Sequence, residues 1–372
     1  MFELLNCVHD VIADVSHETC ETEDGTVVER LYTEDARIPV LVYSPFDYGP
    51  AWYTATSVNP AKSFGVVMAH FGWDLYIVDD RTVDLPAGTC ETSLATCAFG
   101  GTISLADRVD DGLAVLDVIE SEYGTGRAIV GGYVGGAVAA AALADEAPGR
   151  IEGLWLWNGS TVGTLETQAY NAPGCGLLEF FLASGINVIP GGALKYLFDG
   201  FQADPDGPPI LPPEAFGLAG TYTAEELFYA VMTTHVDAPQ WPTPLFRFFT
   251  GNADDGLVGV FPEDQFEHVD FDDVFTIGDL GGTYTSVGML HDIICTLAGD
   301  TTYSSNIGSY EGEVIMLGSS GGFGPDMQAL ATQMPNAHIV SHFIEAGESD
   351  RYFSNARFFL ADLGLALWSY SF

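Results

Sequence analysis

A serine flanked by glycines at residues 318–322 is the first candidate for chemistry in this sequence. The segment Gly318-Ser319-Ser320-Gly321-Gly322 satisfies the G-x-S-x-G pattern, follows the apolar run 313–317 and precedes a possible helix. A serine held at a sharp turn after a strand attacks ester carbonyls when a histidine and an acid support it. Ser320 is therefore a candidate nucleophile, although the same small residues also predict a simple tight turn.

The histidines offer weak support for such a serine. His291 is adjacent to Asp292, as a base would be to its orienting acid, but both lie on a predicted helix of apolar neighbours, which favours a satisfied core pair. The remaining candidates do not show the H-x-x-x-H spacing on a helix that binds zinc: His235, His268, His338 and His342. The sequence therefore predicts no zinc site, and the metal content stays open.

Six cysteines, an even number, predict disulfides, because neither zinc-site spacing nor a C-x-x-C redox motif is present. Six cysteines allow fifteen connectivities, and buried thiols are the alternative. Disulfides would imply an oxidising, extracellular compartment or the cell surface. Our preferred pairing joins neighbours along the chain: Cys7 with Cys20, Cys90 with Cys97, and Cys175 with Cys295.

The chain is extremely acidic, with 52 Asp and Glu against 11 Lys and Arg in 372 residues and a net charge of −41. Nucleic acid is excluded as a partner, because neutralising phosphates requires basic residues. Such a charge repels itself at low ionic strength, which predicts a saline or alkaline environment or bound divalent cations. Structural calcium at Asp204 and Asp206, or at Asp254 and Asp255, is the sharper alternative, although no twelve-residue calcium loop is present.

Targeting and membrane signals are weak. Residues 1–20 carry His, Asp and Glu and do not resemble a signal peptide, which leaves open that one has been removed. The apolar stretch 358–368 is too short and interrupted for a membrane span and predicts a packed terminal helix instead, so no transmembrane segment is expected. Asn158-Gly159-Ser160 is a glycosylation sequon, but it directly ends a predicted strand, which favours a turn.

These residues are positioned by alternating strands and helices, which predict a mostly parallel sheet covered on both faces. Ser104, with an acid three residues on, predicts a helix start, and Gly72 predicts a helix end. Trp155 and Trp157 alternate with leucines, which is typical of a sheet core. The predicted strands are 26–32, 38–43, 127–130, 151–157, 313–317 and 337–343, with a further strand and its exit loop at 73–81. The predicted helices are 61–71, one that starts at 104 and has apolar positions as far as 119, one that ends near 144, 223–233 and 352–368.

In order and spacing these segments resemble the α/β-hydrolase superfamily, most of all its acid-lipase and esterase branch. The segment 39–47, P-V-L-V-Y-S-P-F-D, resembles the branch's P-V-L-L-x-H-G-L-x-D, and 72–76, G-W-D-L-Y, resembles G-Y-D-V-W. The turn 130–136, V-G-G-Y-V-G-G, stands where V-G-H-S-x-G-G is expected. The resemblance covers 20–160 and 310–368 and implies a core at 1–162, an inserted cap at 163–262 and the rest of the core at 263–372.

The same resemblance implies that the catalytic triad is lost. Tyr133 stands in the place of the nucleophilic serine, Gly321 in the place of the acid and Glu348 in the place of the histidine. The His-Gly of the oxyanion loop is Ser44-Pro45 here, and proline has no N–H to offer an oxyanion. These changes predict that ester hydrolysis has been lost.

We therefore expect a non-enzymatic extracellular protein whose scaffold serves binding, self-assembly or another surface component, without a cofactor. A hydrolase of lipids, esters or polymers with a rewired site around Tyr133, Ser320 and Glu348 is the alternative from another class. A third hypothesis is a pseudoenzyme that binds a small apolar molecule under the cap. Tyr133 would partly fill that pocket, which disfavours the third hypothesis.

Overall fold

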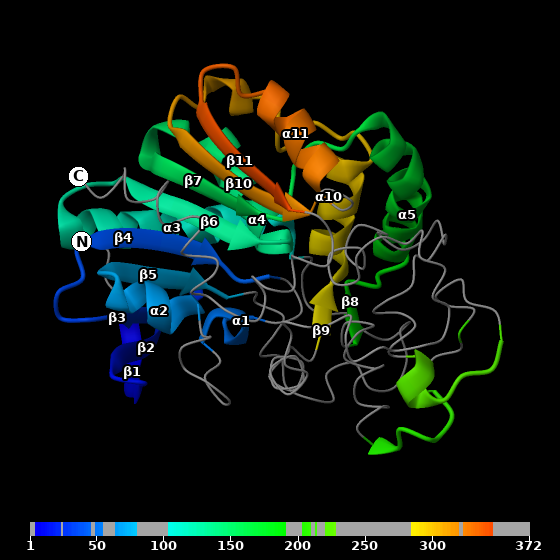
Figure 1. The fold of residues 1–372 in the computed structure, drawn as a ribbon, viewed down its shortest axis with the longest axis horizontal. Helices are drawn as coiled ribbons and strands as arrows, with labels where there is room; N and C mark the ends of the chain where they lie inside the picture. The colour runs from blue at the N-terminus through cyan, green and yellow to red at the C-terminus, as the bar shows by residue number, and fades with distance from the viewer. Residues whose placement is uncertain are drawn as a thin grey trace.

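The computed structural model describes residues 4–23, 25–45, 49–54, 64–79, 103–190, 203–209, 213, 220–227, 284–319 and 323–344. Within these residues a nine-stranded sheet forms the centre of the molecule, in the order β1-β2-β3-β5-β4-β6-β7-β10-β11 (Figure 1). Its strands are β1 (Leu5–Ile12), β2 (Val15–Glu21), β3 (Val27–Tyr32), β4 (Ile38–Tyr43), β5 (Trp73–Val78), β6 (Ala128–Tyr133), β7 (Ile151–Trp157), β10 (Glu313–Ser319) and β11 (His338–Ile344).

The sheet is parallel from β5 to β11, whereas β1, β2, β3 and β5 pair antiparallel. The parallel strands are continuous apolar runs, as expected for strands covered on both faces. Every residue of β5 and of β6 is buried, for example. The predicted α/β architecture with a mostly parallel sheet is therefore confirmed.

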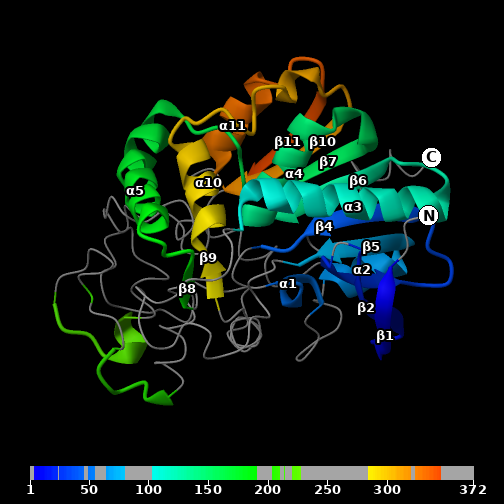
Figure 2. The same cartoon turned by 180° about the vertical axis from the view of Figure 1, so that it is seen from behind.

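Helices cover both faces of the sheet. Helices α3 and α4 lie on the face turned toward the viewer in Figure 2, and α2 lies on the opposite face, in front of β5 in Figure 1. Beyond the strand ends, α5 and α10 lie side by side in both views. The helices are α1 (Ala51–Thr54), α2 (Phe64–His70), α3 (Leu105–Tyr123), α4 (Gly135–Glu146), α5 (Leu165–Ala183), α10 (Val287–Leu297) and α11 (Gly324–Thr332).

Local capping explains where the helices begin and end. Ser104 and Asp107 form a reciprocal capping box at the start of α3, and Gly124 closes that helix in the left-handed conformation. Gly72, at φ 88°, follows α2 as predicted. In α4, ten consecutive residues from Gly135 to Ala144 are buried, which is possible because they are nearly all small.

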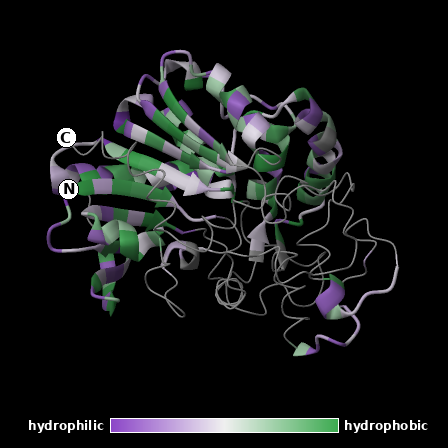
Figure 3. Cartoon of the chain, viewed as in Figure 1, coloured by the Kyte–Doolittle hydropathy of each residue, from purple (hydrophilic) through white to green (hydrophobic). Residues whose placement is uncertain are grey.

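The core consists of two apolar layers, one on each face of the sheet. One layer joins α3, α4 and α11 to the sheet, and the other joins α2 to β4, β5 and β7. Figure 3 shows hydrophobic colouring concentrated on the strands of the sheet and on the inner sides of the helices. Among the described residues, none of the helices combines the length and apolarity that crossing a membrane requires.

Several elements differ from the expectations drawn from the sequence. The hairpin β1–β2 and the 19-residue helix α5 were not predicted, and neither was the small antiparallel pair of β8 (Val188–Pro190) and β9 (Tyr284–Ser286). Of the predicted helix 223–233, residues 224–227 are helical and 228–233 lie outside the described residues. The predicted terminal helix 352–368 also lies outside them.

Candidate functional site

The turn between β6 and α4 is the candidate site, at the carboxyl edge of the parallel strands. Strand β6 ends at Tyr133 and α4 begins at Gly135, so the direction of the chain reverses at the single residue Val134. Val134 has φ 51° and ψ −113°. A positive φ is a genuine outlier for a β-branched residue, so the surrounding structure must impose it.

Glycines on both sides of Val134 impose this conformation. A Cβ on Gly132 would lie 2.3 Å from the carbonyl carbon of Gly136, and a Cβ on Gly136 would lie 2.3 Å from the carbonyl oxygen of Tyr43. A Cβ on Gly159, just after β7, would lie 2.4 Å from the carbonyl oxygen of Val134. The turn is therefore packed against backbone from two neighbouring strands, and only glycine fits at these positions.

This geometry moves the tip of the turn by one residue from where the sequence analysis placed it. Tyr133 was expected at the tip, but the strained residue is Val134, which lies midway between the close-packed Gly132 and Gly136. A G-x-S-x-G elbow holds its nucleophile at the middle position, between the glycines. The chain has an apolar valine there.

Tyr133 lies in the core beside the turn. Its side chain is 3% exposed, and its ring packs edge-on against Trp157 with centroids 4.8 Å apart. Trp155 and Trp157 are both buried, and Phe64 of α2 stacks on Trp155 at 5.0 Å. The expectation that the two tryptophans belong to the sheet core is therefore confirmed, and aromatic rings fill the space on this face of the sheet.

The loop after β4 offers no free donor at Ser44 or Pro45. The backbone N–H of Ser44 donates to the carbonyl oxygen of Val78 at 3.0 Å, and its hydroxyl donates to the same oxygen at 3.0 Å. Pro45 has no N–H. Neither residue can therefore stabilise a developing oxyanion, and residues 46–48 lie outside the described residues.

Arg108 on α3, which was not predicted to have a role, fixes this loop from the buried side. Its guanidinium is fully buried and donates to the backbone carbonyls of Ser44, at 3.0 Å, and of Asp79. It also lies over the ring of Tyr43, 5.2 Å from the centroid. The helical spacing of Leu105, Arg108 and Val109 on one stripe was the available signal, since it places an arginine on the buried face.

The predicted acid and histidine positions lie outside the residues that the structure describes. Ser320, Gly321 and Glu348 lie outside the described residues, so the site around them stays a prediction. The buried carboxyl nearest in sequence is Asp326, in the first turn of α11, which accepts a hydrogen bond from the backbone N–H of Thr164 at 2.7 Å. Burial raises the pKa of Asp326 and the bonds from Thr164 oppose that rise. Asp326 thus fastens the start of α5 to α11.

The sequon at Asn158 is a buried turn. Asn158 is fully buried at φ 53°, and its backbone N–H donates to the carbonyl oxygen of Leu317 at 2.8 Å. Ser160 donates its hydroxyl to the carbonyl oxygen of Asp326. The turn interpretation is confirmed, because a buried amide cannot carry a glycan in the folded chain.

The disulfide predictions are confirmed wherever the structure describes the cysteines. Cys7 is bonded to Cys20, and Cys175 is bonded to Cys295. Cys90 and Cys97 lie outside the described residues.

Two groups of side chains among the described residues have the spacing of metal ligands, and neither contains Asp204 or Asp206. Asp254 and Asp255 lie outside the described residues, so calcium binding stays a prediction. The first group is Cys7, Glu18 and Cys20, and the second is Cys175, Glu179, His291 and Cys295.

The predicted histidine candidates do not gather at the turn. The Nδ1 atom of His291 lies 2.9 Å from the carboxylate of Asp292, which also accepts hydrogen bonds from the backbone N–H of Leu105 and the hydroxyl of Tyr303. His338 pairs with Glu313 at the start of β10. His342 lies further along β11, and His235 and His268 lie outside the described residues.

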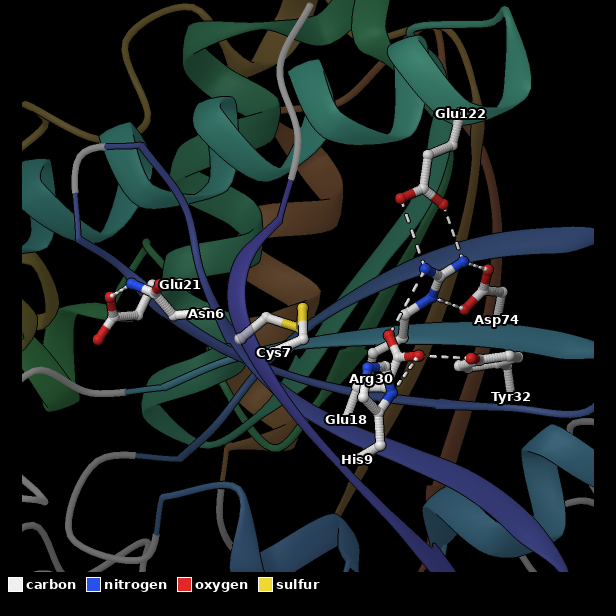
Figure 4. The surroundings of a disulfide bond; sticks show 10 residues. Asn6, Cys7, His9, Glu18, Glu21, Arg30, Tyr32, Asp74 and Glu122 are labelled. Carbon is white, nitrogen blue, oxygen red and sulfur yellow. Dashed lines mark hydrogen bonds and ion pairs between the residues drawn. A yellow bond between two sulfur atoms is a disulfide. The ribbon is translucent and has the colours of Figure 1, made fainter.

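A second charged cluster, around Arg30, fastens the amino-terminal strands to α3 (Figure 4). Arg30 donates to both oxygens of Asp74, at 2.8 and 2.7 Å, and to Glu122 at 2.8 Å. The rings of Tyr32 and Tyr76 lie 4.6 and 4.8 Å from its guanidinium carbon. Burial lowers the pKa of Arg30, but the hydrogen bond and charge of Asp74 raise it above its ordinary value. This cluster was not predicted, and it holds the sheet together far from the turn.

Comparison with solved structures identifies similar folds. A candidate lipase from Sulfolobus solfataricus matches with a TM-score of 0.60 at 14% identity, over 98% of this chain and 99% of that one. A hydrolase from Pseudomonas aeruginosa matches with a TM-score of 0.49 at 15% identity, over 97% and 99% of the two chains. A carboxylesterase from Nitrososphaera gargenis matches with a TM-score of 0.47 at 11% identity, over 92% and 95%. No protein-family model and no curated protein sequence matches the chain.

Proposed function

Because this chain has the α/β-hydrolase fold, we propose that it is a non-catalytic member of that fold, an extracellular scaffold that serves binding or assembly. The observation that carries the proposal is Val134. A side chain without a hydroxyl, thiol or carboxylate occupies the strained strand-to-helix turn, the position from which this fold presents a nucleophile. The strained backbone conformation of the turn is present, but the side chain at its tip has no nucleophilic atom.

The neighbouring groups do not replace what Val134 lacks. The Tyr133 ring is packed in the core against Trp157, and a tyrosine hydroxyl, with an ordinary pKa of about 10, is a poor acyl acceptor. The N–H of Ser44 is engaged by Val78, and Pro45 has none to offer. Acyl transfer needs a nucleophile and oxyanion donors at one point, and both are compromised at this turn.

The rest of the molecule suits a structural or binding role outside the cell. Two disulfides fit an oxidising compartment, and a net charge of −41 fits saline or alkaline surroundings. The aromatic filling around Tyr133 and Trp157 disfavours a small apolar ligand at the old active site. We therefore prefer self-assembly, or contact with another surface component, bridged by cations.

A hydrolase with a rewired site is the second candidate. Ser320 directly follows β10 in the sequence. Strand β10 runs parallel to β7 and β7 runs parallel to β6, so the G-x-S-x-G segment begins at the same edge of the sheet as the turn at Val134. The similar structures are described as a lipase, a hydrolase and a carboxylesterase, which keeps this candidate open.

Hydrolysis of short- and long-chain p-nitrophenyl esters in high salt separates the two candidates. We expect no turnover by the wild type, by Ser320→Ala or by the matched control Ser309→Ala. Turnover that Ser320→Ala abolishes and Ser309→Ala preserves would establish a relocated nucleophile and overturn the proposal. Val134→Ser, which returns a hydroxyl to the tip, tests whether the remaining site supports chemistry.

Assembly is tested separately, by electron microscopy and light scattering in salt with calcium. Because the surface is acidic, we expect assemblies to dissolve on dialysis into chelator at low salt. Assemblies that are indifferent to both salt and chelator would contradict the cation-bridged contacts.

A further inference from the structure

Two neighbouring helices each present a pair of metal-ligand side chains at a spacing of four residues. Cys175 and Glu179 lie on α5, and His291 and Cys295 lie on α10. Residues four apart lie on the same face of a helix. One ligand atom from each of the four side chains lies within 4.8 Å of every other.

The packing of the two helices brings these pairs together. The Cys175–Cys295 disulfide joins the helices directly, with the two Cα atoms 4.9 Å apart. Leu178, Val287 and Ile294 form a small buried core between the helices. Figures 1 and 2 show α5 and α10 side by side from both directions.

The orientation of His291 is the second, independent observation. Its Nδ1 lies 2.9 Å from Oδ1 of Asp292, and the other carboxylate oxygen of Asp292 accepts from the Leu105 N–H and the Tyr303 hydroxyl, each at 3.0 Å. When a carboxylate accepts the Nδ1–H hydrogen bond of a histidine, the lone pair is on Nε2. Metal-binding histidines commonly use this arrangement, with Nε2 as the ligand atom. With its Nδ1 proton donated to Asp292, His291 would have Nε2 available as a metal ligand.

We propose that reduction of the Cys175–Cys295 disulfide converts this cluster into a zinc site, with Cys175, Cys295, His291 and Glu179 as its four ligands. An external dithiol supplies two electrons and two protons, becomes a disulfide itself and leaves two thiols. Zinc then displaces both thiol protons and binds the thiolates. Two thiolates on a tetrahedral zinc, with Zn–S near 2.3 Å, stand about 3.8 Å apart, a separation that side-chain rotation provides.

The chemistry and placement of the ligands select for zinc. Thiolate and imidazole ligands favour Zn²⁺ over the calcium and magnesium that an acidic surface attracts. Cys295 is buried, whereas Glu179 is exposed and leaves a route for the ion. Disulfide and zinc fasten the same pair of helices, so each state holds α5 on α10.

Cobalt binding tests the proposal. The protein is reduced with dithiothreitol, desalted under argon and titrated with Co²⁺, whose thiolate charge-transfer and tetrahedral d–d absorption report the ligands. We expect both features with the reduced wild type, bleaching by Zn²⁺, and neither feature with the oxidised protein. His291→Ala, which leaves the disulfide intact before reduction, should weaken Co²⁺ binding by at least the roughly 10–100-fold typical of losing an outer-shell partner. Glu179→Gln should weaken it as well.

Matched controls assign the signal to this cluster. Cys7→Ser with Cys20→Ser, which removes the cysteines of the other ligand group, should leave the spectrum unchanged, and Cys175→Ser with Cys295→Ser should abolish it. A spectrum that survives the second pair, or that His291→Ala does not alter, overturns the proposal. So does a reduced wild type that keeps its far-ultraviolet circular dichroism and gives no charge-transfer band, or one that unfolds on reduction whether or not zinc is present.

Discussion

Replacing Gly132 by alanine should be among the most destabilising single changes at the turn. The added Cβ would lie 2.3 Å from the carbonyl carbon of Gly136 and 2.4 Å from its oxygen. Ordinary contacts begin near 3.4 Å, so α4 would have to rise from β6 by about 1 Å. Because α4 is buried almost along its whole length, that movement opens packed core. We expect Gly132→Ala to lower the free energy of unfolding by about 3 kcal/mol or more, the top of the range of about 1–3 kcal/mol for overpacked core substitutions.

The measurement is urea unfolding at constant salt, followed by tryptophan fluorescence. Gly149→Ala is the matched control, because a Cβ there meets nothing within 4 Å. Its free energy of unfolding should stay within about 0.5 kcal/mol of wild type. If Gly132→Ala costs no more than Gly149→Ala at an unchanged slope, strand and helix do not approach as described. The placement of Val134 at the tip of the turn would then fail with it.

Three further perturbations follow from charge and burial. Raising NaCl from 0.1 to 1 M shortens the Debye length from about 10 to about 3 Å and so screens repulsion within a chain of charge −41. The urea midpoint should therefore rise. A midpoint that falls would contradict charge repulsion. Arg30→Ala leaves the buried carboxylate of Asp74 without its cation and should lower the free energy of unfolding by about 3–5 kcal/mol. Arg37, which forms an exposed ion pair with Asp35, should be replaceable by alanine without a shift in the urea midpoint. Burial and the hydrogen bond to Glu18 raise the pKa of Tyr32 to about 12. The pKa of a tyrosine in the unfolded chain is near 10, so the stability that Tyr32 contributes to the fold is complete below pH 10 and is lost as the pH rises from 10 to 12. Tyrosinate absorbance and circular dichroism measured together should change in that window, and normal titration of every tyrosine in the folded protein would refute the assignment.

Local signals in the sequence predicted much of the sheet and several helices. The apolar run 151–157 is β7 as drawn from the sequence, and the capping box at Ser104 opens α3 where it was expected. Such elements are specified by neighbours in the chain, so their pattern is sufficient. The order of the blocks then determined the fold, since parallel strands joined by helices have few arrangements.

The elements that were missed contradict their local signals. Helix α5 contains Pro173 and two glycines, and it is held by packing against α10 and by the Cys175–Cys295 disulfide. The β1–β2 hairpin turns at Ala13 and Asp14, both at positive φ, without the Asn-Gly or Asp-Gly pair that announces such a turn. The contacts with α10 stabilise α5, whereas the hairpin is stabilised by its own Cys7–Cys20 disulfide and by the pairing of β2 with β3.

The site was predicted by position but not by residue. A glycine-rich turn between a strand and a helix was predicted at 130–136, but β6 continues to Tyr133 and α4 begins at Gly135, so the tip lies at Val134 and not at Tyr133. Backbone propensity disfavours a positive φ for valine, so the sequence gives no reason to place Val134 at the tip at φ 51°. The close contacts of Gly132 and Gly136 in the structure explain that conformation. Arg108 was missed although its spacing with Leu105 and Val109 places it on the buried face of α3, because only the structure identifies the two loop carbonyls that it binds.

The Cys175–Cys295 bond also makes a closed covalent ring of the chain between two residues that are 120 positions apart. A protease that cuts once anywhere inside this ring leaves every atom of the molecule still joined. The nicked chain keeps its mass apart from the water added at the cut, and it separates into two fragments only after reduction. A single cut in the part of the expected cap that lies inside the ring, residues 176–262, therefore releases nothing, and release of a fragment requires either reduction or a second cut.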